Sequence, residues 1–111
     1  MQNISNLNPS EAVVLLDPEN VTAQEIIRFT ISELVAEKVF EFYSINQTHN
    51  LRKGIKYNQS LKPYQNIFRE AFKKFQWDPH VPVRVFVEEL MRKVGKSKKI
   101  KNNPIYIKIA N

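Results

Sequence analysis

Two segments in the second half of the chain repeat one helical spacing of apolar residues, and no other feature constrains the fold as tightly. In the first segment the apolar positions recur at i, i+3, i+4, i+7, i+8 and i+11, and they are Tyr64, Ile67, Phe68, Ala71, Phe72 and Phe75. The second segment repeats the pattern with Val83, Phe86, Val87, Leu90, Met91 and Val94. Such a stripe lies along one face of a helix. The sequence therefore predicts two amphipathic helices whose apolar faces lie in a core.

Residues with strong positional preferences mark the ends of these two helices. Pro63 stands in the first turn of the first helix, and Gly95 follows the last turn of the second. The start of the second segment also fits a strand, because valines alternate there at Val81, Val83, Val85 and Val87. The longer match to the helical spacing favours the helix.

Two further helices are predicted in the first half of the chain. A short one spans about 8–16, with Asn8 as its cap. The next spans 22–38 and begins with Thr22 and Glu25, which have the spacing of a capping box. An apolar stripe follows on one side of this helix. The carboxylates expected on its exposed side are those of Glu33 and Glu37.

Strands are predicted in two places by β-branched and aromatic residues. Residues 39–45, a polar loop over 46–50 and an alternating segment over 51–57 together predict a hairpin. A terminal strand is expected over 105–109, and it needs the hairpin as its partner because an unpaired strand is not stable. The predicted fold is one α+β domain over residues 1–111, dominated by helices, with a small antiparallel sheet made of the hairpin and the C-terminal strand.

Residues 22–57 resemble the central part of a winged-helix domain, in which an amphipathic helix leads directly into a two-stranded hairpin whose loop is the wing. The resemblance implies a winged-helix-like topology. In DNA-binding members of that family, the helix before the hairpin reads the DNA and has a basic exposed face. The helix over 22–38 is expected to expose Glu25, Glu33 and Glu37 instead, and carboxylates facing phosphates are unfavourable. We therefore expect no DNA-reading role for this helix.

The composition removes several classes of site. The chain has no cysteine, which excludes disulfides, thiolate metal sites and cysteine nucleophiles. Its only histidines, His49 and His80, have no further ligands at suitable spacing, and two glycines cannot build a phosphate-binding loop. We therefore expect no enzyme activity, no metal and no cofactor. The start of the chain lacks the pattern of a signal peptide, and no apolar run is long enough to span a membrane, so a cytoplasmic location is expected.

Charge is divided unevenly along the chain. Residues 1–50 carry two basic and seven acidic residues, whereas residues 51–111 carry fifteen basic and four acidic ones. The densest basic run consists of Arg92, Lys93, Lys96, Lys98, Lys99 and Lys101. A run of this kind attracts polyanions and makes their binding sensitive to salt. The competing interpretation is a solvated loop whose cations favour the dipole of the preceding helix.

The leading functional interpretation is a small non-catalytic binding module whose basic half engages nucleic acid or another polyanion. The alternative is a protein-interaction or self-association module, in which the acidic surface over 11–41 of one chain meets the basic surface over 52–101 of another. Anionic lipid is a third partner class, but the sequence shows no exposed apolar anchor for it. Aromatic residues beside cations in the helix over 64–75 also fit a base-stacking platform, although their helical spacing assigns them to the core. Trp77 lies in a turn, where core packing is expected first and a partner contact second.

Overall fold

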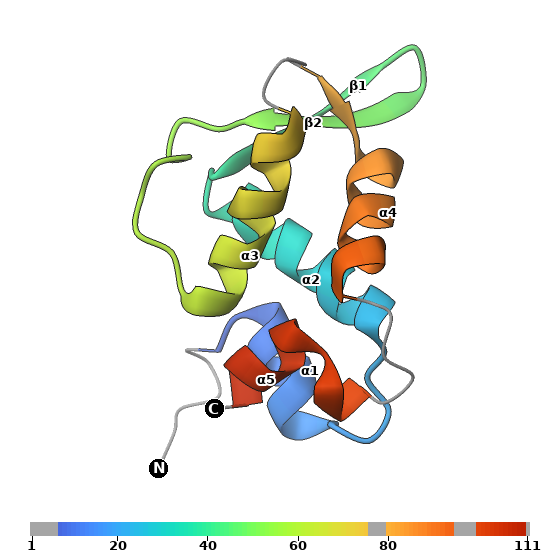
Figure 1. Ribbon diagram of the computed structural model, residues 1–111. Coiled ribbons are helices and arrows are strands. Elements are labelled where there is room, and N and C mark those ends of the chain that lie inside the picture. The colour runs from blue at the N-terminus through green and yellow to red at the C-terminus, as the bar shows by residue number, and fades with distance from the viewer. Residues whose placement is uncertain (1–6, 76–79, 95–99, 111) are drawn as a thin grey trace.

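Helices dominate the described part of the chain, and the three short strands found there gather at one end (Figure 1). The computed structural model describes residues 7–75, 80–94 and 100–110. Its elements in chain order are α1 (Pro9–Leu16), α2 (Ala23–Ala36), β1 (Phe40–Ile45), β2 (Thr48–Lys53), α3 (Pro63–Phe72), a 3-10 turn (Lys73–Phe75), β3 (Val81–Pro82), α4 (Val83–Val94), a second 3-10 turn (Ile100–Asn102) and α5 (Pro104–Ala110). The prediction of a helix-dominated α+β fold with a small antiparallel sheet is confirmed.

The sheet has the order β1-β2-β3, and both pairs are antiparallel. A two-residue turn connects β1 to β2, and its residues Asn46 and Gln47 have φ values of 50° and 68°. Positive φ at both positions is the mark of a type I′ turn, whose twist matches that of the flanking strands. The return strand therefore begins at Thr48 and ends at Lys53, earlier at both ends than the sequence predicts.

The third strand is not the one that the sequence predicts. Residues 105–109 lie in helix α5, and β3 supplies the third strand, with Val81 opposite Leu51. Of the alternating valines, Val81 lies in β3, whereas Val83, Val85 and Val87 lie in α4. The side chain of Asn103 accepts hydrogen bonds from the backbone of Ile105 (2.9 Å) and Tyr106 (3.3 Å), which caps α5. A cap followed by Pro104 favours a helix over a strand.

Helix α2 begins and ends with well-defined backbone motifs. The Thr22 hydroxyl accepts from the N–H of Glu25 at 3.1 Å, as the capping-box spacing predicts. At the other end, the N–H of Lys38 donates to Val35 O (3.1 Å) and the N–H of Val39 donates to Leu34 O (2.9 Å). This is a Schellman motif, and Lys38, with a φ of 66°, occupies the left-handed position that usually holds glycine.

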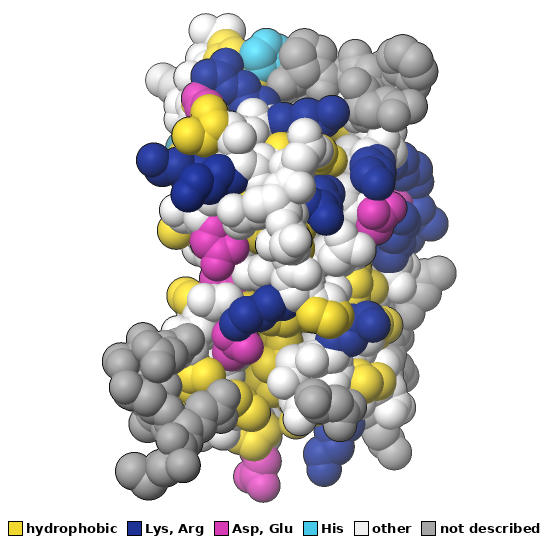
Figure 2. All heavy atoms as spheres, turned by 90° about the vertical axis from the view of Figure 1, so that its left-hand side faces the viewer, with side chains coloured by type: hydrophobic (Ala, Val, Ile, Leu, Met, Phe, Trp, Pro, Cys, Tyr) yellow, Lys and Arg dark blue, Asp and Glu magenta, His cyan; other side chains and the backbone are white. Residues whose placement is uncertain are grey.

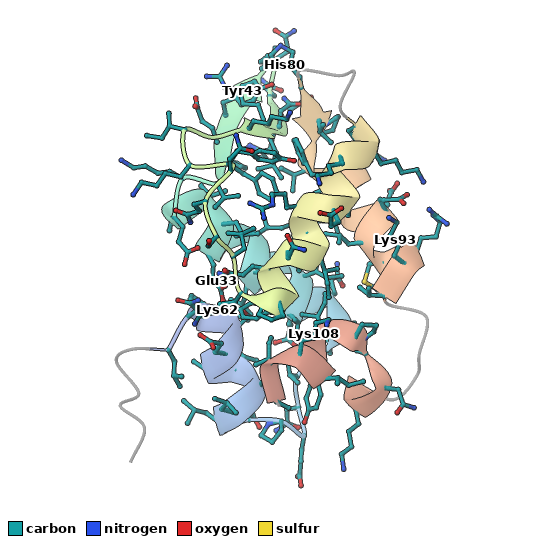
Figure 3. The ribbon with its side chains drawn as sticks, turned by 60° about the vertical axis from the view of Figure 1, so that its left-hand side comes forward. Glu33, Tyr43, Lys62, His80, Lys93 and Lys108 are labelled. Carbon is teal, nitrogen blue, oxygen red and sulfur yellow. The ribbon has the colours of Figure 1, made fainter. Side chains whose placement is uncertain are left out.

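The expectation that Glu33 lies on the exposed side of α2 is wrong. Glu33 is only 3% exposed. Its carboxylate accepts four hydrogen bonds, from the Ser10 N–H (2.7 Å), the Ser10 hydroxyl, the Tyr64 hydroxyl (2.8 Å) and Gln65 Nε2 (3.3 Å). Glu33 therefore joins α2 to α1 and α3 at the centre of the molecule (Figure 3). Glu37 is half-buried and accepts from Gln65 at 3.3 Å.

Aromatic rings from β1, α3 and α4 fill the core between the sheet and the helices. The Phe72 ring lies 4.8 Å from that of Phe40 and 5.5 Å from that of Phe86, and Phe68 is fully buried beside them. The aromatic stripe of α3 is thus part of the core, as its helical spacing predicts, whereas Trp77 lies outside the described residues. In the described part of the chain, none of the helices combines the length and apolar character that crossing a bilayer requires.

Candidate functional site

The basic run over 92–101 is only partly described. Arg92 and Lys93 end α4, and Lys101 lies in the second 3-10 turn, whereas Lys96, Lys98 and Lys99 lie outside the described residues. Lys93 (Figure 3) and Lys101 are exposed, and neither forms an ion pair with a described carboxylate. The structure therefore describes three of the six residues of the run, and whether the six form one surface stays a prediction.

Arg92 has a local partner. Its guanidinium lies 2.6 Å from the Glu89 carboxylate, which also accepts from Lys74 at 2.9 Å. These two hydrogen bonds hold the pKa of Glu89 at about 2, below its usual value of 4.5. Lys74 thus joins the turn after α3 to Glu89 of α4, and part of the charge of Arg92 is compensated by Glu89 within α4.

A second group of cations lies where the hairpin joins the rest of the molecule. The N–H of Gly54 donates to Val39 O (2.8 Å) and the N–H of Lys56 donates to Lys38 O (2.9 Å), so the chain after β2 lies against the chain before β1. This contact brings together three exposed lysines from two segments. We call them the hairpin-base lysines: Lys38, Lys53 and Lys56. Among the described residues, no carboxylate lies within ion-pairing distance of any of the three.

Tyr57 connects this group to helix α3. The Lys53 ammonium lies 5.0 Å from the centroid of the Tyr57 ring, and the Arg69 guanidinium donates to Tyr57 O at 2.9 Å. Burial raises the pKa of Tyr57, while the positive charges of Lys73 and Arg69 act to lower it. Arg69, which is half-buried and also donates to Gln59 O at 2.7 Å, therefore places one positive charge of α3 beside the hairpin base, whereas Lys73 in the following turn is paired with Glu70.

The acidic groups near this surface already have partners. Glu41 pairs with Arg52, opposite it on β2, and Glu70 pairs with Lys73 at 3.0 Å. Glu37, next to Lys38 in the chain, accepts a hydrogen bond from Gln65, and the three hairpin-base lysines form no ion pair with a described carboxylate. Lys and Arg side chains gather over the upper part of this face (Figure 2).

The hairpin base has only a weak signal in the sequence. Residues 52–56 contain three cations, which is a local signal, but the longer run over 92–101 is denser. Lys38 gives no such signal, because only the Schellman motif and the contact with Lys56 bring it to the same place.

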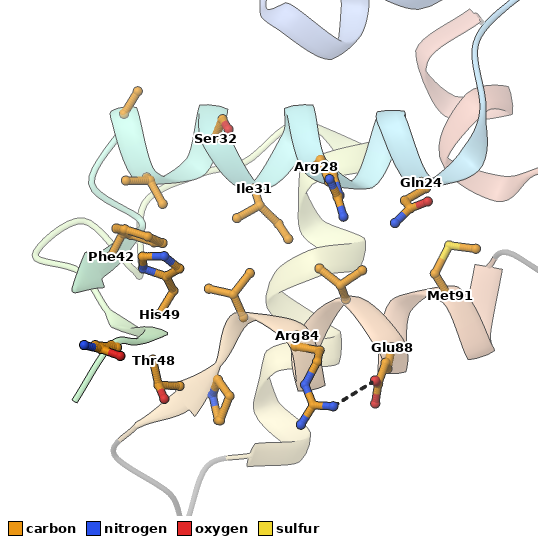
Figure 4. Close-up of a pocket in the computed structure, with 16 residues that line it drawn as sticks. Gln24, Arg28, Ile31, Ser32, Phe42, Thr48, His49, Arg84, Glu88 and Met91 are labelled. Atoms are coloured by element: carbon orange, nitrogen blue, oxygen red, sulfur yellow. Dashed lines mark ion pairs between the residues drawn. The ribbon is translucent and has the colours of Figure 1, made fainter. Parts of the chain in front are cut away.

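A groove of ≈1280 Å³ lies on another side of the molecule, between α2 and α4, with the hairpin at one end (Figure 4). Its apolar lining includes Ile31, Val35, Phe42, Val87 and Met91. Polar side chains also line it, among them Arg28, Arg84 and Glu88, and Arg84 lies 4.0 Å from Glu88.

The burial of Glu33 changes the exposed face of α2. The charged residues that α2 exposes are Glu25 and Arg28, one of each sign, and Glu25 also accepts a hydrogen bond from the Thr22 hydroxyl. Of the three carboxylates expected on the exposed side, Glu25 is exposed, Glu37 is half-buried and Glu33 is buried.

His49 and His80 both lie near the sheet, and each contacts different residues. His49 bonds to the Ser44 hydroxyl at 3.0 Å and stacks on Phe42, while His80 contacts the Tyr43 hydroxyl (Figure 3). Among the described residues, no three His, Asp or Glu side chains lie close enough together to hold a metal ion.

Comparison of the chain with protein-family models, with curated proteins and with solved structures finds no match. Evidence on its function therefore comes from its own residues and their geometry.

Proposed function

We propose that this protein is a non-catalytic module that binds nucleic acid through the phosphate backbone, with the hairpin-base lysines as its main contact. The observation that carries the proposal is the charge of the exposed Lys38, Lys53 and Lys56, which form no ion pair with a described carboxylate, are held together by backbone hydrogen bonds and are continued on α3 by Arg69. Lysines bind phosphates as point charges and without base preference. Binding should therefore depend strongly on salt and weakly on sequence.

The order of elements supports the same class of function. Helix α2 leads through a short connection into the β1–β2 hairpin, which is the arrangement on which the winged-helix resemblance rests. With Glu33 buried, α2 no longer presents three carboxylates to a nearby phosphate. The third strand of the sheet, β3, follows α2 and the β1–β2 hairpin in the chain and lies between α3 and α4.

The run over 92–101 enters the proposal as a second contact region. Lys93 and Lys101 are exposed, whereas Arg92 is paired with Glu89. We expect the run to add to affinity through Lys93, Lys101 and the neighbouring lysines of the sequence. The hairpin base supplies the larger effect, because its three lysines are held at fixed positions by the backbone.

The test is a salt titration of binding, followed by fluorescence anisotropy with a fluorescein-labelled duplex of mixed sequence. The logarithm of the binding constant falls as the logarithm of the salt concentration rises, and each lost phosphate contact makes this negative slope shallower by about 0.9. The variant Lys53→Gln/Lys56→Gln should make the slope shallower by about 2. The variant Lys93→Gln/Lys101→Gln should make it shallower by a smaller amount. Lys108→Gln, an exposed lysine on α5, is the matched control and should leave it unchanged. Absence of binding in dilute buffer, or binding that ignores salt, would overturn the proposal.

A protein-binding function is the second candidate, and the groove between α2 and α4 is the observation that favours it. Pairing of the acidic and basic halves already occurs within one chain, because Lys62 lies 2.8 Å from Glu11 and Arg52 pairs with Glu41. Sizing by light scattering at low and high salt separates the two candidates. A dimer that dissociates at high salt, together with no binding to the duplex, would favour self-association.

A further inference from the structure

The most exposed large apolar side chain in the described part of the chain lies among the hairpin-base lysines. Ile55 is 83% exposed, compared with 60% for Leu16 at the end of α1. Its neighbours in the chain are Gly54 and Lys56, and it lines a hollow of ≈330 Å³ together with Lys38 and with Glu41, whose carboxylate is paired with Arg52. Ile55 buries almost none of its apolar surface in the fold. The side chain can therefore bury that surface against a partner, which would stabilise the complex.

The backbone holds Ile55 in place from both sides. The N–H of Gly54 is bonded to Val39 O at 2.8 Å, and the N–H of Lys56 is bonded to Lys38 O at 2.9 Å. A Cβ on Gly54 would lie 2.2 Å from Lys38 O, so the close approach of the two segments requires glycine. A side chain on a fixed backbone loses little conformational entropy when it binds.

The charge around Ile55 narrows the class of partner. The three lysines attract phosphates, whether these belong to nucleic acid or to lipid. Membrane binding by an apolar contact grows with the buried apolar area, and one isoleucine supplies little of it. A single branched apolar side chain flanked by cations is sufficient to enter a partly opened step between stacked bases.

We propose that Ile55 acts as an apolar wedge, which contacts bases at a distorted or easily unstacked step of a duplex while the hairpin-base lysines contact the flanking phosphates. This inference rests on the proposed function and adds to it a preferred substrate, namely duplexes that are already locally unstacked. Opening a paired step costs free energy, and a mismatch has already lost part of the stacking. The protein therefore binds a mismatched duplex more tightly than a fully paired one.

The experiment compares two fluorescein-labelled duplexes of the same length, one fully paired and one with a central mismatch. For the full chain we expect about fivefold tighter binding to the mismatched duplex, and Ile55→Ser should abolish this preference without changing the salt slope. Lys53→Gln/Lys56→Gln should make the slope shallower and keep the preference. Leu16→Ser, which removes an exposed apolar side chain from the opposite end of the molecule, is the matched control and should behave as the parent.

The outcomes separate the wedge from the function on which it rests. If the parent shows no preference, or if Ile55→Ser keeps it, the wedge is wrong, while the lysine variants still test the binding of phosphates. If neither duplex binds, the proposed function fails as well. Sedimentation with vesicles containing phosphatidylserine is the third arm. Vesicle binding that Ile55→Ser abolishes, without any effect on the duplexes, would overturn the wedge in favour of a lipid contact.

Discussion

Replacement of Glu33 by alanine should destabilise the fold by about 3 kcal/mol, although Glu33 lies in none of the proposed binding surfaces. The carboxylate accepts four hydrogen bonds in a site closed to water, and the bonds from the Ser10 N–H (2.7 Å) and the Tyr64 hydroxyl (2.8 Å) have good length. A hydrogen bond to a charged group contributes about 1.5–3 kcal/mol net, so these two alone supply about 4 kcal/mol. The variant also relieves the desolvation of a buried carboxylate, which reduces the loss. A net loss of about 3 kcal/mol is a large part of the 5–15 kcal/mol that is typical of a domain.

The assay is urea denaturation followed by circular dichroism at 222 nm, with Glu37→Ala as the matched control. Glu37, the residue directly after α2, is half-buried and accepts one bond of 3.3 Å from Gln65, so the loss in Glu37→Ala should amount to less than about 1 kcal/mol. Glu33→Gln keeps the shape of the side chain and one acceptor oxygen, and it should fall between the two. If Glu33→Ala unfolds at the same urea concentration as Glu37→Ala, the buried network does not hold the three helices together and the reasoning is refuted.

Three further measurements test other parts of the structure. Because the folded pKa of Glu89 is about 2 and its usual value is 4.5, Glu89 stabilises the fold above about pH 4.5 and loses this effect towards pH 2, so the difference in free energy of unfolding between the parent and Glu89→Gln should shrink over that range. Phe72→Ala should cost about 3–5 kcal/mol in urea denaturation, and stability equal to that of the parent with loss of duplex binding would contradict its place in the core. Lys38→Gly should raise the melting midpoint by relieving about 1 kcal/mol of left-handed strain and should weaken duplex binding, and a fall in both would show that the side chain supports the fold.

Local signals were sufficient to predict most of the helices. Helix α2 begins at the capping box of Thr22 and Glu25, and α3 begins at Pro63, because these preferences act within one turn of the chain. At α5 two local signals conflict, since isoleucines at every second position fit a strand whereas Asn103 followed by Pro104 favours a helix. The structure follows the cap, and Asn103 also donates to Val94 O of α4 at 2.5 Å, a contact that the local pattern does not show.

The burial of Glu33 and the grouping of the hairpin-base lysines were not predictable from local pattern either. Helical periodicity shows which residues share a face of α2, but it does not show how far α1 and α3 extend around that helix. Lys38 and Lys56 are brought together by a backbone contact between two segments. The candidate run over 92–101 was visible because its cations are neighbours in sequence, whereas the hairpin base becomes visible only after folding.

The pairing of the first and last helices has a consequence for how the chain folds. Helix α1 packs against both α2 and α5, and Val14 of α1 and Ile105 of α5 are buried (Figure 1). Contacts between segments so distant in sequence raise the contact order, which slows folding because a long loop must close before they form. During synthesis, the apolar side of α1 must therefore wait for residues 104–110 to leave the ribosome before it is fully covered. The upper part, with the sheet, α3 and α4, is made entirely of residues synthesised before α5.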